Sequence, residues 1–292
     1  MLVRLTALLG VLLILSGCSA AHRAETRFPD GTSVHTMAFG GLNRSYRVHK
    51  PPGLAGPAPL VVMLHGAFGD GEQAENDYGW DSLADSAKFV VAYPDGVGAT
   101  WNGHGGCCGK AERENIDDVG FITTMAGQIS ADLPIDKARV YATGISNGGI
   151  MSYALACNSG IFAAIGPDSA TMLDACPAPH PTSVIHIHGT SDRLVPYTGG
   201  QGASTVNGPS IPDVNAFWRK VDQCGPPDIT TNAPITTSTA ACADNRSVEL
   251  ITIQGGRHQW PGGTTFLEKT SQTSHALNAT QTIWQFFATH PA

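Results

Sequence analysis

Ser146 lies between two glycines in the stretch Gly144-Ile145-Ser146-Asn147-Gly148. A β-branched and aromatic run, Val140–Thr143, precedes this stretch, and a helix-like segment follows it. The pattern G-x-S-x-G between a strand and a helix is typical of a nucleophile elbow, a turn so tight that side chains at both glycine positions would collide. An ordinary strand–turn–helix connection is the alternative. The sequence therefore makes Ser146 a candidate nucleophile.

A serine hydroxyl is a weak nucleophile unless a base removes its proton and an acid orients that base. His258 and Asp192 each follow directly on an expected strand, and the chain order Ser, Asp, His is that of α/β-hydrolases. Asp168 also follows a strand and is the competing acid. Ser152 is a weaker nucleophile candidate because it lies inside an expected helix. The residues predict a catalytic triad of Ser146, Asp192 and His258.

Acyl transfer through such a serine needs an oxyanion hole, made of two backbone N–H groups that face the carbonyl oxygen. The N–H of Asn147, directly after the nucleophile, is expected to be one. We assign the other to Ala67 in the loop "HGAFGDG", with Gly66 as the alternative. His65 is expected to hold this loop in place by hydrogen bonds.

Four aromatic residues fall in loops at the catalytic end and are candidates for an acyl or aromatic substrate pocket: Trp101, Trp260, Phe68 and Tyr197. Scattered surface and core aromatics are the alternative. His186 and His188 could begin a zinc site, but a His-x-His pair inside a strand is more often packing. The triad itself requires neither a metal nor an organic cofactor.

The elements that must position these residues alternate between strand and helix. Strands are expected at Tyr46–His49, Pro59–Gly66, Phe89–Gly96, Val140–Thr143, Phe162–Ser169, Ser183–Asp192 and Ser247–Gly256. Helices are expected at Trp80–Lys88, Asp117–Leu133, Ile150–Cys157, Val214–Val221 and Leu277–Ala288. This alternation predicts an α/β fold with a doubly wound, mostly parallel sheet, in which catalytic residues lie at the carboxyl ends of the strands. The stretch Thr230–Ala241, rich in Thr and Ala, is interpreted as a surface loop.

The formal net charge is −7, and Lys and Arg form no cluster, so the sequence gives no support to a nucleic-acid partner. Near the N-terminus, Arg4 precedes the apolar run Leu5–Leu15, which has signal-peptide length. The run ends in "LSGC", which resembles the lipobox of bacterial lipoproteins, whose cysteine carries the lipid. We predict a lipoprotein signal peptide over residues 1–18 with lipidation at Cys18, a tether over 19–29 and a catalytic domain over 30–292. An ordinary secretion signal is the alternative.

Export would place the cysteines that follow Cys18 in an oxidising compartment. An even number remains, although spacing alone cannot choose the pairs. We expect Cys224–Cys242 to close a Pro- and Thr-rich segment and Cys157–Cys176 to close the segment after a helix. Cys107 and Cys108 would then form the remaining bridge.

Taken together, "LHGAFGDG", "YPDG", "WNG", "CCG", "IDDVGFI", "GISNGG", "IHGTSDRLVPY" and "RHQWPGG" resemble motifs of the polyhydroxybutyrate depolymerase-like esterase family, which is related to feruloyl esterases. The resemblance runs from about Tyr46 to the last helix. It implies an α/β-hydrolase fold, ester hydrolysis through a serine acyl-enzyme, and the triad roles given above. Lipid-anchored members of the family occur in mycobacteria.

The resemblance leaves the substrate open. Family members that attack solid polyester add linker and surface-binding domains, so short hydroxyalkanoate oligomers, small acyl esters or feruloyl-type esters are expected here. An acyltransferase or peptidase using the same triad is an alternative, as is a non-catalytic, lipid-anchored binding protein on the same fold.

Overall fold

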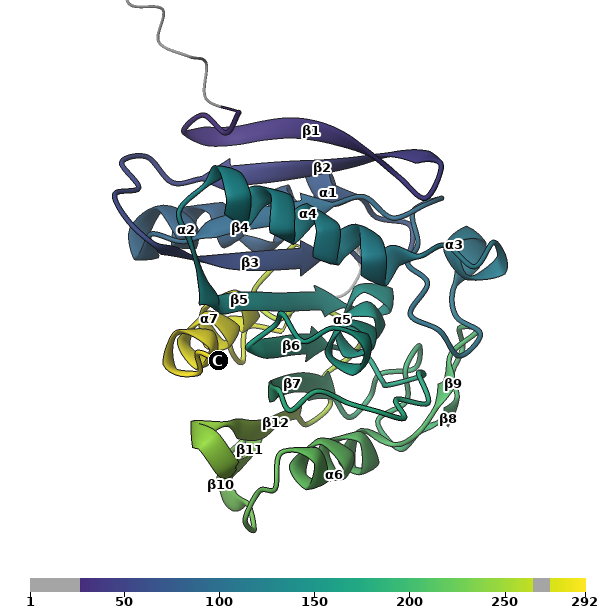
Figure 1. Ribbon diagram of the computed structural model, residues 1–292. Helices are drawn as coiled ribbons and strands as arrows, with labels where there is room; N and C mark the ends of the chain where they lie inside the picture. Colours follow the sequence, from purple (N-terminus) through teal and green to yellow (C-terminus); the bar gives the residue numbers. More distant parts are fainter. Residues whose placement is uncertain (1–26, 265–273) are drawn as a thin grey trace, which may run out of the picture.

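The computed structural model describes residues 27–264 and 274–292. The predicted signal peptide, Cys18 and most of the predicted tether lie outside the described residues. A ten-stranded sheet with the order β1-β2-β4-β3-β5-β6-β7-β12-β11-β10 forms the centre of the described chain (Figure 1). Its strands are β1 (Gly31–Phe39), β2 (Leu42–Lys50), β3 (Ala58–Leu64), β4 (Val90–Pro94), β5 (Ile135–Ile145), β6 (Ala164–Asp168), β7 (Ser183–Gly189), β10 (Asp228–Asn232), β11 (Ile235–Ala241) and β12 (Ser247–Ile253).

The middle of the sheet is parallel, and its two edges are antiparallel. Strands β4, β3, β5, β6, β7 and β12 pair in parallel, whereas β1 and β2 on one side and β11 and β10 on the other pair antiparallel. Short strands β8 (Gly200–Gln201) and β9 (Asn207–Gly208) form a separate pair. The prediction of a doubly wound, mostly parallel sheet is confirmed.

Helices cover both faces of this sheet (Figure 1). They are α1 (Gly71–Tyr78), α2 (Trp80–Ala87), α3 (Gly109–Arg113), α4 (Asp118–Asp132), α5 (Asn147–Asn158), α6 (Ile211–Val221) and α7 (Ala279–Thr289). Helix α4 begins where Asp117 accepts a hydrogen bond from the Gly120 N–H at 2.7 Å, which satisfies one of the free donors of the first turn.

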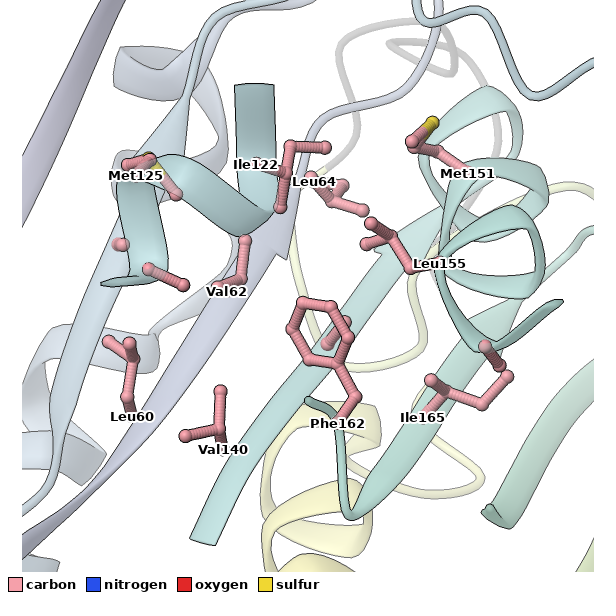
Figure 2. Close-up of a cluster of buried hydrophobic side chains, with 14 of the residues drawn as sticks. Leu60, Val62, Leu64, Ile122, Met125, Val140, Met151, Leu155, Phe162 and Ile165 are labelled. Atoms are coloured by element: carbon pink, nitrogen blue, oxygen red, sulfur yellow. The ribbon is translucent and has the colours of Figure 1, made fainter. Parts of the chain in front are cut away.

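Strand β3 shows why a continuous apolar run is needed at the centre. All of its residues are buried, and side chains alternate between the two faces of the sheet. Leu60, Val62 and Leu64 join a core cluster with helices α4, α5 and α6, part of which is drawn in Figure 2. Val61 and Met63 join a second cluster with α1, α2 and α7. Each such side chain contributes roughly 1.5–3 kcal/mol to folding, so the strand is fixed from both sides.

The interpretation of Thr230–Ala241 as a loop is wrong. The segment forms most of strands β10 and β11, which pair with each other and, through β11, with β12. Thr is β-branched and favours strands when a neighbouring strand offers an edge. The low-complexity composition concealed this preference.

The structure contains the three expected disulfides, Cys107–Cys108, Cys157–Cys176 and Cys224–Cys242. Across residues 27–264 and 274–292, no helix combines the length and the apolar character that a membrane crossing requires.

Candidate active site

Ser146 lies on a sharp turn between β5 and α5. Its backbone angles are φ 57° and ψ −122°, an unusual conformation for a residue with a side chain. A Cβ at Gly144 would lie 2.6 Å from the Leu64 carbonyl oxygen, and one at Gly148 would lie 2.3 Å from the same atom. The crossing of β3 and the turn therefore excludes side chains at both glycines, as the G-x-S-x-G pattern predicts. The side chain of Ser146 remains partly exposed.

Asp192 and His258 are in direct contact. His258 Nδ1 lies 2.8 Å from Asp192 Oδ2, and the Asp192 side chain is fully buried. The loops that carry them meet where Gly189 contacts Gly256, since a Cβ at Gly189 would lie 2.2 Å from the Gly256 carbonyl oxygen. A side chain at Gly189 would push these loops apart.

Backbone donors surround the other oxygen of Asp192. The N–H groups of Leu194 and Val195 donate to Oδ1 at 2.8 and 2.9 Å. Burial by itself would raise the pKa of Asp192, but its contact with His258 and the nearby N–H groups bring the pKa below its ordinary value. The carboxylate is therefore ionised and held in one orientation beside the imidazole.

The sheet order brings Ser146 to the same edge. Strand β6 lies between β5 and β7, and β7 pairs with β12, so Ser146, Asp192 and His258 all follow the carboxyl ends of neighbouring parallel strands. Among the hydrogen bonds of the described residues, none joins the Ser146 hydroxyl to the imidazole. Such contacts are often long in active sites without substrate.

Asp168, the competing acid, is placed differently. The end of β6 lies beside the nucleophile, because the Ser146 N–H donates to the Asp168 carbonyl oxygen at 2.9 Å. Its carboxyl group, however, is fully buried and has no hydrogen-bond partner within the part of the chain that the structure describes. Burial raises the pKa of Asp168 well above its ordinary value, and the neighbouring Ser169 hydroxyl donates to the Gln259 carbonyl oxygen instead. Asp168 thus holds its proton to higher pH than an ordinary aspartate does, whereas the hydrogen bond to His258 comes from Asp192.

The loop after β3 lies against the nucleophile, since a Cβ on Gly66 would lie 3.7 Å from the Ser146 Cβ. The Phe68 N–H already donates to the Ala99 carbonyl oxygen at 2.8 Å. The backbone N–H groups of Gly66, Ala67 and Asn147 donate no hydrogen bond within residues 27–264 and 274–292. These three N–H groups remain available for an oxyanion.

His65 holds this loop from inside the protein. Its Nε2 accepts a hydrogen bond from the Gly96 N–H at 2.9 Å, and its Nδ1 lies 2.8 Å from the Gly66 carbonyl oxygen, to which it donates. The Trp101 indole N–H donates to the His65 carbonyl oxygen at 2.9 Å. Burial lowers the pKa of His65, which keeps the ring neutral. The expected structural role of His65 is confirmed.

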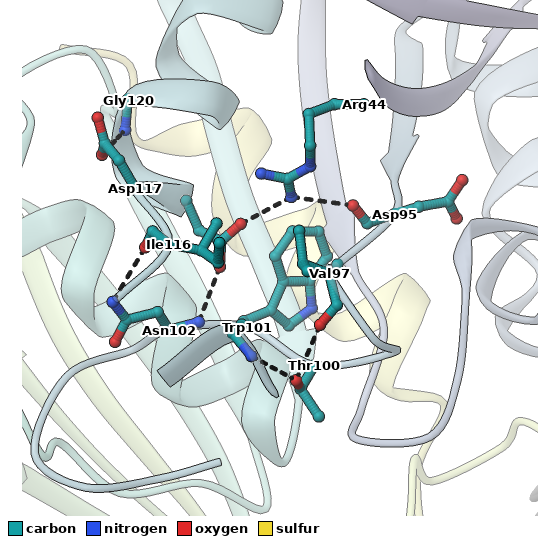
Figure 3. A network of polar contacts seen from close by, with 12 residues as sticks. Arg44, Asp95, Val97, Thr100, Trp101, Asn102, Ile116, Asp117 and Gly120 are labelled. Atoms are coloured by element: carbon teal, nitrogen blue, oxygen red, sulfur yellow. Dashed lines mark hydrogen bonds and ion pairs between the residues drawn. The ribbon is translucent and has the colours of Figure 1, made fainter. Parts of the chain in front are cut away.

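The Asn147 side chain fixes the start of helix α5, a role that the sequence did not reveal. It accepts a hydrogen bond from the Trp101 N–H at 2.7 Å and donates to the Trp101 carbonyl oxygen at 3.0 Å. The next residue, Asn102, donates through its backbone to Asp118, which forms a buried ion pair with Arg44 at 2.7 Å. Figure 3 shows polar contacts on the far side of Trp101, among them those of Arg44 with Asp95 and of Asn102 with Ile116. The buried Arg44–Asp118 ion pair thus supports the Trp101 loop, and this loop holds Asn147 in place next to Ser146 by two hydrogen bonds.

The four predicted pocket aromatics fall into two groups. Trp101 and Trp260 have no exposed surface, and the Trp260 indole N–H donates to Thr280 at 2.9 Å. Both are core residues, so the prediction that they line a pocket is wrong. Aromatic side chains near a catalytic motif often pack beneath it, because the motif needs a rigid support. Phe68 is 75% exposed, and Tyr197 is half-buried with its hydroxyl 3.0 Å from Thr252 Oγ1.

The two strand histidines do not form a zinc site. His186 and His188 are fully buried, and each ring nitrogen of both residues already has a hydrogen-bond partner. A different group, His49, Glu75 and Asp81, has ligand atoms within 4.8 Å of one another. Glu75 accepts a hydrogen bond from Arg47 and Asp81 accepts one from Tyr93, so these carboxylates are already paired.

Comparisons with known proteins identify the family of this chain. Residues 44–199, more than half of the chain, match the family "Esterase PHB depolymerase". NocK of Nocardia uniformis subsp. tsuyamanensis, named as an esterase, is 30% identical over 80% of this chain and 75% of its own length. Feruloyl esterase C of Emericella nidulans is 28% identical over 96% of this chain and 97% of its own length.

Solved structures show the same fold. An acetyl xylan esterase from Aspergillus awamori has a TM-score of 0.63 and 16% identity over 88% of this chain and 99% of its own. An S-formylglutathione hydrolase from Agrobacterium tumefaciens has a TM-score of 0.56 and 13% identity, and the match covers 89% of this chain and 95% of that one. The fold is that of the α/β-hydrolases, and the protein is a carboxylic-ester hydrolase. The chain belongs to the esterase PHB depolymerase family.

Proposed function

We propose that the protein hydrolyses carboxylic esters through a triad of Ser146, His258 and Asp192. The single observation that carries the proposal is the contact of 2.8 Å between His258 Nδ1 and Asp192 Oδ2, at the same sheet edge as the strained Ser146 turn. A binding protein would need neither the strained serine nor an ionised acid oriented on a histidine.

In the proposed reaction, His258 Nε2 takes the proton of Ser146 Oγ as that oxygen attacks the ester carbonyl carbon. The N–H groups of Asn147 and Ala67 stabilise the resulting oxyanion, and Gly66 is the alternative second donor. His258 then gives the proton to the leaving alcohol, which departs and leaves an acyl-serine. Water, deprotonated by His258, attacks this acyl group and releases the acid.

The proposed substrates are soluble esters: short hydroxyalkanoate oligomers, acyl esters or feruloyl-type esters. Phe68 favours an apolar or aromatic group near the oxyanion hole. It is 75% exposed although apolar, and its backbone is held at φ 69° by its hydrogen bond to Ala99. Tyr197 is a second contact candidate. Names of the relatives point the same way, since they include feruloyl and acetyl xylan esterases.

We also propose that the protein is exported and lipid-anchored through Cys18, or secreted if cleavage follows an ordinary signal. The three disulfides support an oxidising compartment. Replacing Cys18 by Ala should abolish incorporation of a radiolabelled fatty acid into the protein in cells, while ester hydrolysis persists. Equal labelling of the Cys18→Ala variant would refute the anchor.

Ser146→Ala tests the catalytic proposal on a panel of short-chain acyl, hydroxybutyrate-oligomer and feruloyl esters. We expect the turnover rate to fall about 10⁴-fold or more on whichever ester is hydrolysed. Ser152→Ala is the matched control, because Ser152 is a buried serine of α5, the helix after Ser146, and its hydroxyl donates to the Gly148 carbonyl oxygen. Turnover retained by Ser146→Ala would overturn the proposal. Ester formation with an added alcohol would instead indicate an acyltransferase.

A further inference from the structure

A chain of buried hydrogen bonds runs from α5, the helix that follows Ser146, to the loop around the acid of the proposed triad. The Tyr153 hydroxyl of α5 lies 2.6 Å from His186 Nδ1 on β7. His186 Nε2 lies 3.0 Å from His188 Nδ1, and His188 Nε2 lies 2.9 Å from the Val195 carbonyl oxygen. Tyr153, His186 and His188 are all fully buried.

The chemistry of the last acceptor sets the direction of every bond in this chain. A carbonyl oxygen can only accept, so His188 Nε2 carries the hydrogen. Burial lowers the pKa of His188 to about 4, so at neutral pH its Nδ1 is an acceptor. His186 must then donate from Nε2 and accept at Nδ1 from the Tyr153 hydroxyl. Each ring is left with one defined tautomer.

The last histidine of the chain lies beside the carboxylate that contacts His258. His188 Nε2 lies 3.4 Å from Asp192 Oδ2, the same oxygen that contacts His258. The same His188 N–H donates to the Val195 carbonyl oxygen, and the Val195 N–H in turn donates to Asp192 Oδ1. The His188 N–H therefore fixes the loop around Asp192 through the Val195 carbonyl oxygen. The positive end of this N–H dipole also lies near the negative charge of the Asp192 carboxylate.

Two simpler explanations fit less well. As a metal site, the pair has no free ring nitrogen. A purely structural role would account for the satisfied ring nitrogens, because buried polar groups are normally hydrogen-bonded. It would not account for the position of the His188 N–H, which lies 3.4 Å from Asp192 Oδ2 and bonds the loop that holds this carboxylate. We infer that His188 is a positioning residue for Asp192, and that Tyr153 and His186 hold His188 in the tautomer that this role requires. The inference rests on the proposed triad.

The inference has a consequence for the proton affinity of the Asp192–His258 pair. Without the His188 N–H, the unprotonated pair, which carries a full negative charge, loses more stabilisation than the protonated pair, which is neutral overall. Protonation then becomes easier, and the acid limb of the pH profile of kcat/KM moves to higher pH.

The other groups that bear on this pair are few. Asp168 lies near Asp192, and burial together with the charge of Asp192 raises the pKa of its carboxyl well above the ordinary value. His186 faces His188 from the same strand and is neutral, because burial lowers its pKa well below the ordinary value. The Tyr197 ring packs against His188 at 5.9 Å between centroids.

Two variants of His188 in the full-length protein separate positioning from packing. Asn places its amide near the former Nδ1 and so retains a partner for His186, whereas Gln places an N–H near the former Nε2. We expect His188→Asn to move the acid limb of kcat/KM upward by up to roughly 1 pH unit, because the N–H dipole that lies 3.4 Å from Asp192 Oδ2 is lost. In His188→Gln the acid limb should lie within a few tenths of a pH unit of its wild-type position. Equal limbs in the wild type and both variants would overturn the inference.

Tyr153→Phe should shift the limb in the same direction by a smaller amount, because it removes the hydroxyl that holds the His186 tautomer. Tyr141→Phe is the matched control. Tyr141 is also a buried tyrosine, and its hydroxyl has no hydrogen-bond partner within the described residues. A shift in Tyr141→Phe equal to that in Tyr153→Phe would mean that the buried chain has no special role.

A measurement on the wild type covers the case in which the His188 variants do not fold. Imidazole ¹⁵N chemical shifts should show His188 neutral, with hydrogen on Nε2 and none on Nδ1, from about pH 5 to 8. Hydrogen on Nδ1 would overturn the inference. A wild-type protein that hydrolyses no ester would instead count against the proposed function, because the tautomer of His188 can be read without any turnover.

Discussion

Asp168 and Asp192 follow neighbouring strands at the same edge of the sheet, yet their surroundings give them opposite properties. Asp192 accepts hydrogen bonds from two backbone N–H groups and contacts His258, so its pKa is lowered. Asp168 is equally buried but has no hydrogen-bond partner within the described chain, and burial raises its pKa well above the ordinary value. A position at the carboxyl end of a strand therefore brings a carboxyl group to the site, and N–H donors decide whether it is ionised there.

The largest effect should come from removing the charge of Asp192. Asp192→Asn preserves the size of the side chain but favours the wrong tautomer of His258, so kcat should fall about 10⁴-fold. Steady-state kinetics on the best ester of the panel would measure this. A loss below about tenfold would show that another group orients His258.

Asp192→Glu separates charge from position. The carboxylate is retained, but the longer side chain moves it away from the Leu194 and Val195 N–H groups. A displacement of about 1 Å can cost roughly a hundredfold in rate, so we expect a loss of that order. Wild-type turnover in this variant would mean that the N–H donors do not matter for catalysis.

Asp168→Asn should change how folding stability depends on pH. The folded protein retains a proton on Asp168 that the unfolded chain releases above its ordinary value of 3.8. Wild-type stability therefore contains a term that is fully present below that pH and is lost as the pH rises toward the higher folded-state value. Asn does not titrate, so Asp168→Asn should gain stability relative to the wild type as the pH rises above 3.8. Urea unfolding at several pH values measures the difference, and a constant difference would mean that Asp168 is ionised in the folded protein.

The smallest effect should be that of Asp168→Asn on turnover. Asn is nearly isosteric with the neutral carboxyl group, so kcat and KM should stay within about threefold of the wild type. A loss comparable to that of Asp192→Asn would erase the distinction between the two acids and make Asp168 part of the catalytic machinery.

The sequence predicted those parts of the fold and site that depend on short-range chemistry. Continuous apolar runs located the central strands, and two glycines around Ser146 located a turn that only small residues can form. The contact of Asp192 with His258 agrees with a prediction that rested on chain order and on strand ends.

What the sequence did not reveal depends on contacts that are distant along the chain. Trp101 and Trp260 lie in segments next to catalytic motifs, and only tertiary packing decides that they are core residues. The edge strands β1 and β11 are rich in polar and Thr residues, so they lack the apolar runs that mark a buried strand. One part of the hydrogen-bond chain was visible in the sequence: His186 and His188 are two residues apart in an expected strand, so their side chains lie on the same face. The first member of the chain, Tyr153, comes from another element.

The most direct test of the central claim is to incubate the full-length wild-type protein with a fluorophosphonate and to locate the adduct by peptide mass. We expect a single adduct on Ser146, formed at nearly the same rate in Asp168→Asn and much more slowly in Asp192→Asn. Ester turnover that is blocked by an adduct on a different residue, with Ser146 unmodified, would contradict the proposed triad.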